Sequence, residues 1–80
     1  MKATVIKANY ARSLYVFERE DGEYGFFELL DFYDLEPEEI LIGDFSEPGE
    51  KKVVHKATSK KFKIFIEDFC SLKQAEEMIH

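Results

Sequence analysis

The sequence contains a single cysteine, Cys70, among its 80 residues. No disulfide can therefore form within the chain, and packing alone must hold the fold together. The chain lacks an apolar run of the ~18–20 residues that a membrane-spanning helix needs, and Met1–Lys7 lacks the apolar stretch of a signal peptide. We expect a single domain over residues 1–80, located in the cytoplasm and with no membrane partner.

Residue patterns that commonly build catalytic or metal sites are also missing. The four glycines are scattered, so no glycine-rich loop is present to cradle a phosphate. His55 and His80 are far apart and there is no cysteine pair, which does not match the spacing of a zinc site. The clustered carboxylates lack the spaced loop that calcium needs. We predict a protein that is not an enzyme and has no cofactor.

Charge is present in quantity but is distributed unevenly. Seventeen acidic and eleven basic residues give a net charge of −6, which works against attraction to nucleic acid. Residues 18–50 hold thirteen acids and one base, whereas residues 51–66 hold six lysines and no acid. These charges either form solvated faces that steer strand pairing, or the lysines mark the footprint of a phosphate-bearing or acidic partner.

Short β-branched and aromatic runs separated by turn residues predict about six strands. A polar connector, Leu30–Glu39, interrupts them, with a helical turn begun by Pro37. The second hairpin is expected to turn at Ser59-Lys60. The predicted strands are Lys2–Ala8, Ser13–Glu18, Glu23–Leu29, Ile40–Phe45, Lys51–Thr58 and Lys61–Glu67.

Asp21-Gly22 predicts the turn of the first hairpin, because a type I′ turn needs positive φ at both central residues. A two-residue loop at this point places Phe17 opposite Phe26. Alternation along the two strands then collects four aromatic side chains on one face. They are Tyr15, Phe17, Tyr24 and Phe26.

The end of the chain predicts a short helix that runs to Ile79. Ser71 and Gln74 have the spacing of a capping box, in which each side chain bonds the other residue's backbone amide. One side of the helix is apolar, so we expect it to dock on the sheet or to close one end of a barrel. That side carries Leu72, Ala75, Met78 and Ile79. The expected fold is mainly β (α+β), a small antiparallel β-barrel or curved sheet of about six strands with one short C-terminal helix.

Tyr24-Gly25-Phe26-Phe27 resembles the aromatic-Gly-Phe centre of the RNA-binding motif shared by RRM and cold-shock domains. Gly22 and Glu23 stand where that motif has a basic residue and its first glycine. The order of strands and helix is similar to small OB-fold or cold-shock-type barrels. The resemblance implies oligonucleotide binding on Tyr15, Phe17, Tyr24 and Phe26, with lysines as phosphate contacts. These are Lys51, Lys52, Lys56, Lys60, Lys61 and Lys63.

Two functions remain open from the sequence. The preferred one is a non-catalytic interaction module whose apolar aromatic β-surface binds a protein partner or a second copy of the chain, because monomers seldom expose large apolar patches. The alternative is a barrel that binds single-stranded nucleic acid. The position of the lysine-rich second hairpin relative to the aromatic face decides between them.

Overall fold

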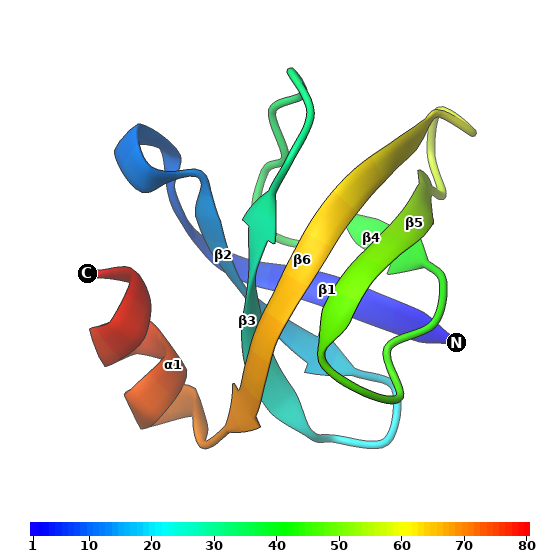
Figure 1. Cartoon of the computed structure of the whole chain (residues 1–80). Helices are drawn as coiled ribbons and strands as arrows, with labels where there is room; N and C mark the ends of the chain where they lie inside the picture. The colour runs from blue at the N-terminus through cyan, green and yellow to red at the C-terminus, as the bar shows by residue number, and fades with distance from the viewer.

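Six antiparallel strands pair around a closed ring in this computed structural model, which describes all residues from Met1 to His80 (Figure 1). A short 3-10 helix, Tyr10–Arg12, follows β1, and the helix α1 ends the chain. The predicted fold class is confirmed. The elements are β1 (Lys2–Asn9), β2 (Leu14–Arg19), β3 (Tyr24–Leu29), β4 (Ile40–Ile42), β5 (Gly49–His55), β6 (Lys61–Cys70) and α1 (Leu72–Ile79).

The barrel consists of two three-strand meanders joined at both sides. β1, β2 and β3 form one meander and β4, β5 and β6 form the other, in the ring order β1-β2-β3-β6-β5-β4. Leu29 pairs with Ile64 at one junction and Lys2 pairs with Ile42 at the other. The ten-residue β6 is long enough to pair with both β3 and β5. Closure pairs the strands that would otherwise lie at the edges of an open sheet.

The turn of the first hairpin differs from the prediction by one residue. The Gly22 amide donates to the Arg19 carbonyl (2.9 Å), and the Arg19 amide donates to Glu23 (2.7 Å). The loop therefore has three residues, and only Gly22 has positive φ (90°). Phe17 consequently pairs with Gly25 rather than with Phe26, so the predicted register is wrong.

This shift separates the four aromatic residues that were expected to share a face. Tyr15 and Phe17 point into the barrel, where they pack with Phe27. Phe26 points outward and packs beneath α1, while Tyr24 is half-buried. A slip of one residue moves every side chain of a strand to the opposite face.

Two apolar clusters result, one inside the barrel and one between the barrel and α1. The inner cluster gathers thirteen buried residues from all six strands and the loops between them, including Leu35 of the β3–β4 connector. The outer cluster joins Ala75 and Ile79 of α1 to three residues of β2 and β3. Those three are Leu14, Val16 and Phe26.

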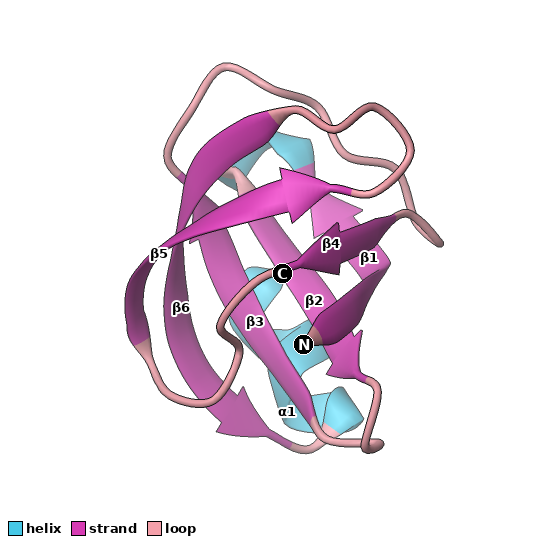
Figure 2. Ribbon diagram, turned by 90° about the vertical axis from the view of Figure 1, so that its right-hand side faces the viewer, coloured by secondary structure: helices cyan, strands magenta, loops and turns pink.

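The predicted capping box of α1 is confirmed. The Ser71 hydroxyl accepts a hydrogen bond from the Gln74 backbone amide (3.2 Å), and the Gln74 side-chain Oε1 accepts one from the Ser71 backbone amide (3.3 Å). α1 lies beside the barrel in Figure 1 and behind its strands in Figure 2, docked on the outside against β2 and β3, which is one of the two expected arrangements. Met78, predicted on the buried side, is exposed instead. At eight residues, α1 is not long and apolar enough to cross a bilayer.

The remaining element boundaries also differ from the prediction. β4 ends at Ile42 rather than at Phe45. Pro37 begins no helical turn: the Glu39 amide donates to Glu36 (3.2 Å) in a reverse turn in which Glu38 has φ 78°. β5 ends at His55, and a five-residue loop of residues 56–60 precedes β6.

Candidate binding surface

The β5–β6 hairpin has one face in the core and one face in solvent. Val53 and Phe62 pair across it and are buried, as is Ile64. Successive side chains of a strand point to opposite faces, so the residues between these point outward. Lys52, Lys61 and Lys63 occupy those outward positions and are exposed.

Lys52 and Lys63 lie directly opposite each other across the two strands. Like charges in directly opposed positions destabilise a sheet. Carboxylates do not relieve this repulsion, because neither lysine forms an ion pair. Three further lysines of the hairpin also lack one: Lys61 beside them, and Lys56 and Lys60 at the loop end. We call these five residues, Lys52, Lys56, Lys60, Lys61 and Lys63, the lysine face.

Lys51, the sixth predicted lysine, is not part of this face. Its ammonium group lies 3.4 Å from Asp44 and 3.6 Å from Glu47, and its side chain is largely covered. Hydrogen bonds from the Ser46 hydroxyl and amide, together with Lys51, lower the pKa of Asp44 to about 2. The charge of Lys51 is therefore neutralised within the molecule, and its predicted place beside the other lysines is corrected.

Phe32 lies beside the lysine face and was not among the residues predicted from the sequence. It belongs to the β3–β4 connector, yet its relative accessibility is 109%, the highest of any large apolar residue in the chain. A hollow of about 380 Å³ is lined by Phe32 and five neighbours. These are Asp31, Tyr33, Lys60, Lys61 and Phe62. An aromatic residue in a predicted polar connector was the only available signal of this site.

A buried histidine links the β3–β4 connector to the β5–β6 loop through hydrogen bonds. His55 is only 3% exposed, and its Nδ1 lies 2.6 Å from the Tyr33 hydroxyl and 2.9 Å from the Thr58 hydroxyl. Its Nε2 lies 2.6 Å from Glu39 Oε2, although the carboxylate is not in line with the ring N–H. With a carboxylate beside Nε2, the proton is assigned there and Nδ1 acts as the acceptor.

The same groups, a carboxylate, an imidazole and a hydroxyl, make up nucleophilic triads. Here both the Tyr33 and the Thr58 hydroxyls compete for one nitrogen, and the ring is enclosed by the barrel end. The geometry suits a structural link between β5, the β5–β6 loop and the β3–β4 connector. It gives the connector a fixed position against the hairpin.

The aromatic residues predicted to form a stacking platform are mostly buried. Tyr15 is 1%, Phe17 0% and Phe26 7% exposed. The lysine face does not extend this predicted platform, because the inner aromatics lie inside the barrel and Phe26 lies under α1. The expectation of one exposed aromatic surface is therefore wrong.

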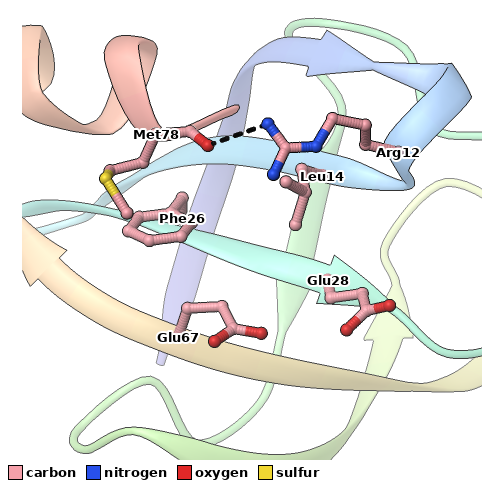
Figure 3. Close-up of a pocket in the computed structure, with 6 residues that line it drawn as sticks. All are labelled: Arg12, Leu14, Phe26, Glu28, Glu67 and Met78. Atoms are coloured by element: carbon pink, nitrogen blue, oxygen red, sulfur yellow. Dashed lines mark hydrogen bonds between the residues drawn. The ribbon is translucent and has the colours of Figure 1, made fainter. Parts of the chain in front are cut away.

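Phe26 does reach the floor of an open hollow of about 340 Å³ beside α1 (Figure 3). Leu14 and Met78 supply further apolar walls, and Glu28 and Glu67 project from the neighbouring strands β3 and β6. Neither carboxylate forms an ion pair. Across the hollow, Arg12 donates to the Met78 carbonyl (3.4 Å) and the His80 carbonyl (2.7 Å). The two carboxylates make this side of β6 acidic, in contrast to the lysine face.

No family model matches the sequence, and neither a curated protein nor a solved structure shows significant similarity to it. The resemblance to OB-fold and cold-shock-type barrels stays a prediction.

Proposed function

We propose that the protein is a small non-catalytic interaction module that binds a macromolecule carrying a run of negative charges across the lysine face. The observation that supports this most strongly is the opposed pair Lys52 and Lys63, with three further lysines around it and no carboxylate in ion-pair contact with any of them. A fold that keeps directly opposed like charges loses stability. An anionic partner would recover it.

Binding through an apolar aromatic β-surface, the function preferred from the sequence, has lost its main support. The residues that were to form that surface contribute to the two apolar clusters, with the exception of the half-buried Tyr24. A partner of the lysine face is instead held by charge. A protein partner that presents a run of acidic residues meets the same requirement.

The net charge of −6 limits the range of this attraction but does not abolish it. Exposed charges farther apart than about 10 Å are largely screened at 0.1 M salt, so a ligand at the hairpin responds mostly to the local lysines. We therefore expect modest affinity with a strong dependence on salt concentration.

The test uses fluorescently labelled heparin, a polyanion without bases, in an anisotropy titration at low salt. The Lys61→Ala/Lys63→Ala variant removes two charges from the lysine face. We expect binding to weaken roughly 10- to 30-fold, taking about 1 kcal/mol for each lysine at an anionic surface. The salt dependence should also become shallower.

Lys7→Ala/Lys73→Ala is the matched control, since it changes the net charge equally at exposed lysines outside the hairpin. We expect this control to bind heparin nearly as well as the wild type. Equal losses in both variants would show that only net charge matters, and the lysine face would lose its assigned role. Urea unfolding of both variants checks that each is folded, with changes within about 0.5 kcal/mol.

A further inference from the structure

Phe32 is the one large aromatic side chain that stands entirely free of the protein. If the loop around it were mobile, ordering that loop on binding would cost conformational entropy and weaken the affinity. The backbone on both sides of Phe32 is instead held in place. The backbone at Phe32 is therefore fixed, while its ring is left unpacked and open to solvent.

On the N-terminal side of Phe32, hydrogen bonds to β6 fix the backbone. The Asp31 carboxylate accepts the Lys63 amide (2.7 Å), and the Leu30 amide donates to the Lys63 carbonyl (3.0 Å). These bonds tie the connector to the strand that carries two lysines of the face. Figure 1 shows the connector and the β5–β6 turn at the same end of the barrel.

On the C-terminal side of Phe32, the backbone is fixed by the contacts of Tyr33. Its hydroxyl bonds to His55, and its ring stacks on Phe62 with the centroids 4.9 Å apart and the planes 16° apart. The Lys60 ammonium lies 5.6 Å from the centre of the Tyr33 ring. A free aromatic face and two unpaired ammonium groups, those of Lys60 and Lys61, thus border one hollow.

We propose that this hollow binds single-stranded nucleic acid, with an unpaired base stacked on Phe32 and the adjoining phosphates on Lys60 and Lys61. The inference rests on the proposed function and adds the class of partner. Any base offers a π-face to an exposed ring, so such stacking tolerates many sequences. In a duplex the bases already stack on one another and cannot reach Phe32. An acidic protein segment would satisfy the lysines but would leave the ring without a stacking partner.

Phe32→Leu is the variant that isolates the ring, because it keeps an apolar side chain and removes the aromatic face. Two probes are compared by anisotropy, a labelled single-stranded DNA 12-mer of mixed sequence and labelled heparin. We expect Phe32→Leu to bind the oligonucleotide roughly 5- to 150-fold more weakly, the range for losing one stacked base, and to bind heparin unchanged. A blunt-ended duplex of the same sequence should bind no better than heparin.

Tryptophan is absent from the chain, so Phe32→Trp creates a single fluorescent reporter at the site. We expect its emission to be quenched by the oligonucleotide and not by heparin. Met78→Trp places the reporter on an exposed position of α1, outside the lysine face, and should not be quenched. Circular dichroism and urea unfolding confirm that the variants fold.

The outcomes separate this inference from the proposed function. Unchanged oligonucleotide binding by Phe32→Leu, with weakened binding by Lys61→Ala/Lys63→Ala, would overturn base stacking and leave a general polyanion site, the result expected for an acidic protein partner. Unchanged binding of both probes by the lysine variant would overturn both. Support requires the loss with Phe32→Leu and a salt dependence for the oligonucleotide that falls by about 1.4 in logarithmic slope when two lysines are removed.

Discussion

The two long hairpins of the barrel, β2–β3 and β5–β6, present opposite surfaces. The β2–β3 hairpin is covered on both faces, by the barrel core inside and by α1 outside. The β5–β6 hairpin is covered on its inner face only, and lysines occupy much of its outer face. The two hairpins differ accordingly in their pattern of burial. Buried and exposed residues alternate strictly along residues 61–66 of β6, but four consecutive residues of β2 are buried.

This difference separates the residues that stabilise the fold from those free to bind. Side chains of the first hairpin exchange water for apolar neighbours, and each large one adds a few kcal/mol to stability. The outward lysines of the second hairpin add nothing comparable, and one pair of them costs stability. Substitutions inside the first hairpin should therefore lower stability, whereas substitutions of the outward lysines of the second should weaken binding.

Phe17→Ala should produce the largest loss of stability. Phe17 is fully buried and contacts the rings of Phe27, Phe45 and Phe69. Removing the ring leaves a cavity, and we expect the free energy of unfolding to fall by about 3–5 kcal/mol. Urea unfolding followed by circular dichroism measures it. Phe65→Ala, on the exposed side of β6, is the control, and a similar loss there would erase the contrast between the hairpins.

Gly25→Ala should be the next most damaging change. A Cβ atom at this position would lie 2.5 Å from the Asp68 carbonyl oxygen and 2.7 Å from the Phe17 ring. Overpacking of this kind costs about 1–3 kcal/mol. Thermal unfolding should show a lower midpoint than for Lys61→Ala, an exposed change on β6. A neutral result would mean that β3 and β6 separate more easily than their pairing indicates.

Lys52→Glu should raise stability while weakening binding. The substitution places a carboxylate opposite Lys63, and replacing repulsion by attraction should increase the free energy of unfolding by about 0.2–1 kcal/mol. Heparin affinity should fall in the same variant. Urea unfolding and anisotropy on one preparation measure both. A variant that is both less stable and unaltered in binding would contradict the role assigned to the opposed lysines.

Asp44→Asn should have the smallest effect and should depend on pH. The pKa of Asp44 is lowered from 3.8 to about 2 in the folded protein, so its ionised form stabilises the fold above pH 3.8 and loses this effect as pH falls towards 2. The wild type should therefore exceed the variant in stability at pH 6, and the difference should shrink by pH 2.5. Urea midpoints at the two pH values test this. A difference that is constant with pH would remove the ionisation of Asp44 as its cause.

Local patterns predicted the fold class, most of the strand positions and the helix cap. Ser71 and Gln74 are three residues apart, so their contacts depend on nearby chain alone. The register of the first hairpin could not be settled in this way. Gly22 fits either a two-residue or a three-residue loop, and the choice depends on Phe17 reaching the core beneath Gly25.

The candidate site was predictable in part. Five of the six proposed lysines form the lysine face, and alternation alone separates the neighbours Lys51 and Lys52 onto opposite faces. Phe32 was not predictable. Its exposure and the course of the backbone around it depend on Asp31 reaching Lys63 and Tyr33 reaching His55, contacts that join residues 32 and 22 positions apart.

The most direct test of the contrast between the hairpins is a ¹H–¹⁵N correlation titration with the single-stranded DNA 12-mer. It reports every backbone amide in the same experiment. We expect concentration-dependent shifts at residues 31–33 and 52–63, reversed by salt, and none at Tyr15, Phe17 or Phe27. Shifts centred on the β2–β3 hairpin, or no shift at millimolar oligonucleotide in low salt, would contradict the assignment of binding to the lysine face.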